Sequence, residues 1–169
     1  MNECAFIKKL TVSAYTIPTD TPEADGTLQW GSTTLVLVEI EAGGKKGIGY
    51  TYAHMATAIL IDKTLKQLVI GEDAMHIPAL TEKMKRCIRN NDNCGIAMMA
   101  VSAVDTALWD LKAKILNVSL GNLIGSVKKE LLVNNRYTIK KKLGEGRSKV
   151  FLCTDVENPY KEFAIKILP

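Results

Sequence analysis

The 169-residue sequence lacks any uninterrupted apolar run close to the roughly 18 residues that a membrane-spanning helix needs, so we expect no membrane partner. Residues 1–10 have no basic stretch ahead of an apolar one, which argues against a secretory signal peptide. The four cysteines form no C-x-x-C pair and have no histidine at zinc spacing, which favours packed thiols over a metal site. These absences predict a cytoplasmic protein, and a hydrophobic content of 47% is typical of a globular core.

Charge is balanced over most of the chain but not at its end. Residues 1–126 carry 12 basic and 13 acidic side chains, whereas residues 127–169 carry 10 basic and 5 acidic ones. A change of composition this sharp predicts a domain boundary near residue 126. The basic residues of the tail are not interleaved with aromatic ones, so we expect no nucleic-acid partner.

Residues 97–115 predict a long amphipathic helix, because their apolar side chains recur at three- and four-residue steps. Ala100, Ala103 and Ala107 are small enough to let a sheet or another helix approach closely. Asn117 ends the periodic run. The apolar positions of this helix are Ala97, Ala100, Val101, Val104, Ala107, Leu108, Leu111 and Ile115.

The stretch from Ala100 to Gly125 also resembles the first signature of the mandelate racemase/muconate lactonizing group of the enolase superfamily. The resemblance implies that residues 1–126 form the N-terminal capping domain of such an enzyme. It further implies that Asp105 and Asp110 make structural hydrogen bonds rather than act as acid or base. An unrelated amphipathic helix is the alternative. The matching positions include Ala100, Ser102, Ala103, Asp105, Ala107, Leu108, Asp110, Leu111, Ala113, Lys114, Ser119, Leu120, Leu123 and Gly125.

The residues ahead of this helix predict an α+β fold, a three-stranded antiparallel meander followed by a helical bundle. Alternation over residues 6–17 predicts the first strand. Residues 33–42 and 47–52, the first of them rich in β-branched and aliphatic side chains, predict a hairpin whose turn is Gly43-Gly44-Lys45-Lys46.

A long loop and two further helices complete the expected domain. Residues 16–32 contain two prolines and two glycines without a regular period, so we expect a loop there. Residues 56–69 predict a helix that buries Ile59 and ends near Gly71. A second helix is expected from Pro78, with Cys87 on its inner face.

The resemblance also gives these loops a role, because two mobile loops of the cap help to set substrate specificity in this family. The alternatives are a plain surface loop and, for the histidine, a structural contact. The candidate specificity residues are Pro18, Asp20, Asp25, Trp30, Tyr52 and His54.

The catalytic groups of the superfamily lie on barrel strands, where carboxylates hold Mg²⁺ and a base removes a proton next to a carboxylate. A (β/α)₈ barrel needs roughly 200 residues, and 43 follow residue 126. We therefore assign no catalytic residue and no metal ligand here. A small carboxylate or sugar acid would be turned over only with a barrel domain.

The second expected domain, residues 127–169, differs from the first, and its residues 131–169 resemble the first three strands of a protein kinase N-lobe. Strands are expected over 136–143, 149–154 and 162–168, forming a small antiparallel sheet. The resemblance implies a glycine-rich loop and an A-I-K lysine that contact ATP phosphates. The loop is one residue shorter than the usual G-x-G-x-x-G-x-V, and a solvent-exposed basic hairpin is the alternative. The candidate nucleotide-binding residues are Gly144, Gly146, Ser148, Val150 and Lys166.

Three functions from different classes follow from this reading. The first is the cap of a racemase, dehydratase or cycloisomerase, catalytically incomplete without its barrel. The second is an ATP-binding module on the tail. The third is a non-catalytic interaction protein that forms homo-oligomers. A fused gene model or rearranged locus would also join two such halves.

Overall fold

The computed structural model describes residues 5–91, 94–125, 132–133, 136–145 and 149–167. The chain divides into two compact units, Met1–Ile124 and Gly125–Pro169. No helix of the described residues combines the length and the apolar character that crossing a bilayer requires.

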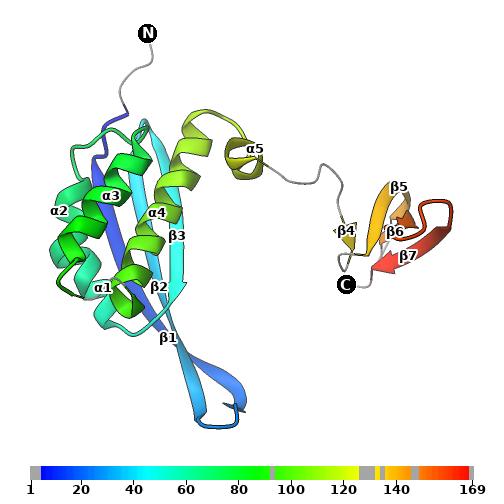
Figure 1. Ribbon diagram of the computed structural model, residues 1–169, viewed down its shortest axis with the longest axis horizontal. Helices are drawn as coiled ribbons and strands as arrows, with labels where there is room; N and C mark the ends of the chain where they lie inside the picture. Colours follow the sequence, from blue (N-terminus) through cyan, green and yellow to red (C-terminus); the bar gives the residue numbers. More distant parts are fainter. Residues whose placement is uncertain (1–4, 92–93, 126–131, 134–135, 146–148, 168–169) are drawn as a thin grey trace. The chain divides into compact units, whose positions relative to one another are not determined.

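The first unit is built on a three-stranded antiparallel sheet of order β1-β2-β3, which confirms the predicted meander (Figure 1). Gly43 and Gly44 alone form the turn between the last two strands, with φ of +55° and +68°. Two positive φ values in succession are what a type I′ hairpin turn requires. Lys45 and Lys46, which were predicted to belong to the turn, instead pair with Ala42 and Glu41 and begin the third strand. The strands are β1 (Lys9–Ala24), β2 (Gln29–Ala42) and β3 (Lys45–Tyr52).

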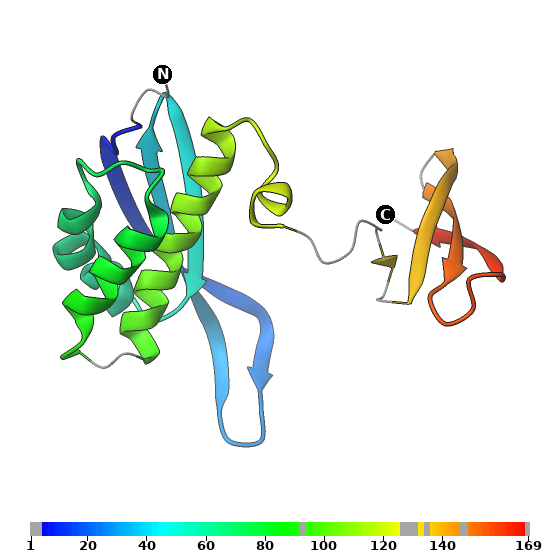
Figure 2. The same ribbon diagram turned by 45° about the horizontal axis from the view of Figure 1, so that its top comes forward.

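The helices of residues 56–115 cover one face of this sheet, whereas the short helix of residues 120–124 lies to its side (Figures 1 and 2). The predicted helix over 56–69 is present, with one π-helical turn in its middle. Gly71, at φ +82°, follows this helix as expected, and Asn117 adopts φ +55° just beyond the long helix. The helices are α1 (Ala56–Leu60), η1 (Ile61–Leu65), α2 (Lys66–Val69), α3 (Ile77–Ile88), α4 (Gly95–Ile115) and α5 (Leu120–Ile124).

The core lies between the sheet and the helices. Alternate residues of β2, including Val36, Val38 and Ile40, are completely buried, as the two-residue period of a strand requires. The apolar face predicted for α4 is buried too, from Ala97 to Leu111. The small residues of α4 were predicted to let a sheet or another helix approach closely. The structure confirms this, because α4 packs closely on β3.

Three further details of the predicted domain are wrong. Residues 16–32 are not a loop, because β1 runs on to Ala24 and β2 begins at Gln29, so the chain forms a hairpin that projects beyond the helices (Figures 1 and 2). Hydrogen bonding between the two backbones stabilises the strands there, although prolines and glycines disfavour strand structure. Ile59 is 57% exposed and Cys87 is also exposed, because each lies just outside the buried stripe of its helix.

The second unit is a four-stranded antiparallel sheet of order β4-β5-β6-β7. It contains the three predicted strands and a short additional one. Cys153 is fully buried, and burial raises the pKa of its thiol. The Tyr137 and Phe163 rings meet edge to face, with centroids 5.6 Å apart. The strands are β4 (Leu132–Val133), β5 (Tyr137–Glu145), β6 (Lys149–Asp155) and β7 (Glu162–Ile167).

Candidate functional site

An open hollow of about 370 Å³ lies where the first half of β2 meets the end of β3. Antiparallel pairing creates it, since Leu35 lies opposite Tyr52 and Ala53 N donates to Thr34 O over 3.1 Å. Three of the six candidate specificity residues come together here from separate segments. The lining residues are Trp30, Ser32, Thr33, Thr34, Tyr52, Ala53 and His54.

The other three candidates lie on the projecting hairpin, outside this lining. Asp25 holds the turn, since its Oδ1 accepts hydrogen bonds from Thr27 N (2.7 Å), Thr27 Oγ1 (2.8 Å) and Leu28 N (2.9 Å). The bond from the Thr27 backbone is the main reason that the pKa of Asp25 is lowered. Pro18 and Asp20 are exposed on β1. Their role in specificity stays a prediction.

Polar contacts fix two side chains of the hollow. Trp30 Nε1 donates to Glu23 Oε2 over 2.8 Å. His54 Nδ1 accepts from Ala56 N over 3.1 Å, at the start of α1. A neutral imidazole that accepts through Nδ1 carries its proton on Nε2. His54 can therefore donate a hydrogen bond to a ligand through Nε2. Tyr52 is 61% exposed, and its ring meets Tyr50 edge to face with centroids 6.2 Å apart.

Sequence reasoning missed four residues of this region. Ser32, Thr33 and Thr34 line the hollow, and Glu23 contacts Trp30 from outside the lining. The pairing of β1 with β2 is irregular between Pro18 and Glu23, so four residues of β1 lie opposite Gly31 alone. Sequence spacing could not place Glu23 opposite Trp30 across such a bulge. Ser32 and Thr34 belong to no recognisable sequence motif, so there was no reason to select them from the sequence.

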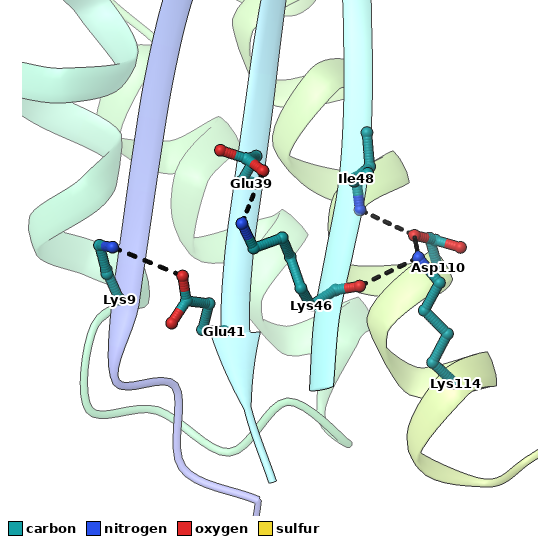
Figure 3. Close-up of polar contacts among 7 residues, drawn as sticks. All are labelled: Lys9, Glu39, Glu41, Lys46, Ile48, Asp110 and Lys114. Atoms are coloured by element: carbon teal, nitrogen blue, oxygen red, sulfur yellow. Dashed lines mark hydrogen bonds and ion pairs between the residues drawn. The ribbon is translucent and has the colours of Figure 1, made fainter. Parts of the chain in front are cut away.

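The acids of α4 make structural contacts, as expected. Asp105 accepts a hydrogen bond from Thr81 Oγ1 on α3. Asp110 Oδ2 accepts from Ile48 N over 2.7 Å and pairs with Lys114 Nζ over 2.7 Å, while Lys114 Nζ also donates to Lys46 O over 3.0 Å (Figure 3). These two side chains satisfy backbone groups on the free edge of β3, which discourages pairing with another chain.

The exposed face of the same sheet carries two cross-strand ion pairs (Figure 3). Lys46 Nζ lies 2.9 Å from Glu39 Oε1, and Lys9 Nζ lies 3.5 Å from Glu41 Oε1. The hydrogen bond to Glu39 is the main cause that raises the pKa of Lys46. Exposed pairs of this kind contribute little to stability, because solvent and salt screen the two charges.

The described residues offer no ligand set for Mg²⁺. No three side chains of histidine, cysteine, aspartate or glutamate within them lie close enough together to hold a metal ion. Mg²⁺ prefers carboxylate oxygens in octahedral geometry. Glu23 is instead engaged by the indole of Trp30, and the two acids of α4 are engaged by groups of α3, β3 and Lys114.

In the second unit, three of the five candidate nucleotide-binding residues form one row across the sheet. Gly144 on β5 lies opposite Val150 on β6, and Val150 lies opposite Lys166 on β7. Gly146 and Ser148 lie outside the described residues. Residues paired across antiparallel strands point to the same face, so Val150 and Lys166 share one side of the sheet.

The family model for the mandelate racemase/muconate lactonizing enzyme N-terminal domain matches residues 11–125. The chain belongs to this family. The match covers all of β2, β3 and the helices and most of β1, so the residues that line the hollow lie within the matched region. The second sheet lies beyond the matched residues.

Three relatives show the extent of the similarity. The 3,6-anhydro-alpha-L-galactonate cycloisomerase of Streptomyces coelicolor is 34% identical over 126 residues, which are 71% of this chain and 35% of that protein. A mandelate racemase/muconate lactonizing enzyme-like protein from Rubrobacter xylanophilus has a TM-score of 0.68 and 49% identity, over 70% of this chain and 33% of that chain.

The third relative is the L-talarate dehydratase of Polaromonas sp. JS666, solved in complex with Mg and L-glucarate. It has a TM-score of 0.63 and 28% identity, over 75% of this chain and 36% of that one. The chain thus spans about a third of the length of the relatives that it matches.

Proposed function

We propose that residues 11–125 are the substrate-capping domain of a mandelate racemase/muconate lactonizing-type enzyme. In this role they form one wall of a pocket for a small carboxylate or sugar acid, and a barrel domain supplies the metal and the base. The observation that carries the proposal is the hollow, where Trp30, Tyr52 and His54 converge from two segments of the chain.

The chemistry of the hollow suits such a substrate. Pockets for small molecules combine aromatic surface with a few polar groups of fixed orientation. Trp30 and Tyr52 provide the aromatic surface, and His54 Nε2 provides a donor for a carboxylate or hydroxyl oxygen. Two relatives support the substrate class: one is named for a sugar-acid cycloisomerase and another was solved with L-glucarate.

A titration of the full chain with glucarate tests this proposal. In ¹⁵N-labelled protein, we expect saturable shifts of the resonances that line the hollow, with the indole of Trp109 on α4 as an internal reference. Adipate, which has the same length and both carboxylates but no hydroxyl groups, is the matched control ligand. Glucarate shifts that are absent, or that scatter over the surface, would contradict the proposal.

A second candidate function concerns the tail, and the row of Gly144, Val150 and Lys166 favours it. In this proposal the row contacts ATP, with Lys166 reaching the phosphates and Val150 the adenine, as in the start of a kinase domain. Lys166 is exposed, so it is accessible to a ligand.

ATP titration of the wild type against Lys166→Ala tests the second candidate. The expected result is at least about tenfold weaker binding by the variant, since phosphate contacts by lysine are charge-assisted. Lys161→Ala is a matched control, because Lys161 is an exposed lysine of the same unit whose ammonium lies 5.4 Å from the Phe163 ring centroid. Equal affinities of wild type and Lys166→Ala would remove the candidate.

A further inference from the structure

The projecting hairpin contains an irregularity that brings one acid to the hollow. Pro18 lies opposite Ser32, and the next pair along the ladder is Glu23 opposite Trp30. Residues 19–22 therefore have Gly31 alone as their counterpart. A bulge of this kind redirects side chains, and bulges are frequent beside functional sites. Here its effect is to set Glu23 directly across from Trp30.

The hydrogen bond between Trp30 and Glu23 restricts the orientation of the indole ring. Trp30 Nε1 donates to Glu23 Oε2 over 2.8 Å, which is the length of a good charge-assisted hydrogen bond. The indole has a single polar edge, and Glu23 occupies it. Because Trp30 is only half-buried, packing alone does not hold its ring in one rotamer. The hydrogen bond supplies the missing constraint.

A fixed indole suits one class of ligand. The face of an aromatic ring is electron-rich and attracts the slightly positive C–H groups of a polyhydroxylated carbon chain. Ser32, Thr34 and Tyr52 line the hollow with Trp30, and each carries a hydroxyl group that can both donate and accept. Thr34 Oγ1 already shares a hydrogen bond of 3.2 Å with Thr16 Oγ1, so Ser32 and Tyr52 are the hydroxyl groups that we assign to the ligand. His54 adds the Nε2 donor. A diacid without hydroxyl groups would offer no hydroxyl partner to Ser32 and Tyr52.

We propose that Glu23 is a positioning residue, which holds the Trp30 indole at the rim of the hollow as a stacking surface for a polyhydroxylated carboxylate. The inference rests on the proposed capping function and adds to it the residue that orients Trp30 and the hydroxylated class of ligand. Glu23 itself does not line the hollow and acts only through Trp30.

Two variants of the full chain distinguish the orientation of Trp30 by Glu23 from a general effect of the negative charge of Glu23. Glu23→Ala removes the acceptor, whereas Glu23→Gln keeps an oxygen that can accept from Trp30 Nε1 and removes only the charge. Glu41→Ala is the matched control, because Glu41 is an acid of the same sheet that pairs with Lys9 and does not line the hollow. The protein contains only two tryptophans, so the indole resonances of Trp30 and Trp109 are assigned with Trp30→Phe.

We expect Glu23→Ala to shift the Trp30 indole resonance, to speed its hydrogen exchange, and to weaken glucarate binding about five- to tenfold, which lies within the net contribution of one typical hydrogen bond. Glu23→Gln should recover most of the affinity, and Glu41→Ala should match the wild type. The Trp109 resonance should stay in place in all three variants, which confirms that the fold is intact.

The outcomes distinguish this inference from the function on which it rests. If wild type binds glucarate at the hollow and Glu23→Ala binds it equally well, positioning by Glu23 is refuted while the capping function stands. If adipate binds as well as glucarate, the hydroxylated class is refuted. If the wild-type hollow does not respond to glucarate, both proposals fall. A wild-type Trp30 indole that exchanges as fast as free tryptophan also refutes the positioning role, without reference to any variant.

Discussion

Replacing Gly49 with alanine tests how closely α4 packs on β3. Gly47 and Gly49 face α4 with no side chain between the two backbones, and both are buried. A Cβ atom added at Gly49 would lie 2.5 Å from Ala107 N and still closer to Ala103 O. Ordinary contacts with carbon lie at about 3.5–4.0 Å, so α4 would have to move by roughly 1 Å.

The cost of that movement follows from where the clash falls. Both contacted atoms, Ala103 O and Ala107 N, belong to the backbone of a 21-residue helix. A side-chain rotation therefore cannot relieve the clash. Overpacking of a core costs about 1–3 kcal/mol and more where the backbone must shift. We therefore expect Gly49→Ala to lower the free energy of unfolding by about 3 kcal/mol.

Urea unfolding followed by circular dichroism at 222 nm measures this change, because all the helices of the described residues belong to the first unit. Gly31→Ala is the matched control on the same sheet, since a Cβ there meets no atom within 4 Å and Gly31 has no positive φ. We expect Gly31→Ala to fall within about 1 kcal/mol of the wild type. A Gly49→Ala protein as stable as Gly31→Ala would refute the account of this packing.

Three further predictions concern single polar groups. Asp110→Ala should lower the free energy of unfolding by about 1–2 kcal/mol, because Ile48 N loses its partner and Lys114 loses one of two, whereas Asp62→Ala, which breaks only ion pairs with Lys63 and Lys66 on the surface, should cost clearly less; equal urea midpoints would contradict this. Thr57→Val should stabilise the protein by about 1 kcal/mol in thermal unfolding, because the buried Thr57 Oγ1 has no hydrogen-bond partner among the described residues; a loss of stability would contradict it. Asp155 accepts from Glu157 N, which is the main cause that lowers its pKa, so its contribution to the second unit should be present above about pH 4 and lost as the pH falls through the lowered pKa. Labelling of buried Cys153 by a pyridyl disulfide, with the other three cysteines changed to serine, should accelerate over that range in the wild type but not in Asp155→Asn; the same pH profile in both would contradict it.

The sequence predicted best the elements whose pattern is set by burial. The helix over 97–115 was predicted because its buried stripe repeats at 3.6 residues, and the structure buries that stripe. The turn at Gly43-Gly44 was predictable because few residues other than glycine adopt two positive φ values in succession. In both places a pattern within one short stretch of sequence is enough to indicate the conformation.

Sequence reasoning failed where pairing between distant segments decides the structure. Residues 16–32 look like a loop by composition, but hydrogen bonding between β1 and β2 carries the strands through Pro18 and past Gly31. The same pairing sets Glu23 against Trp30, which no spacing rule could anticipate. Trp30, Tyr52 and His54 were chosen from a family resemblance, and their convergence depends on the register of β2 with β3.

The measurement that tests the central claim most directly is steady-state kinetics of a hybrid enzyme. Residues 11–125 replace the matching domain of the Streptomyces coelicolor cycloisomerase, and turnover of 3,6-anhydro-alpha-L-galactonate is measured with and without Trp30→Ala, after thermal unfolding has shown that both hybrids fold. If the cap forms a pocket wall and the chemistry lies elsewhere, Trp30→Ala should raise KM about tenfold and change kcat little. A hybrid in which Trp30→Ala abolishes kcat at unchanged KM, or changes neither constant, would contradict the account.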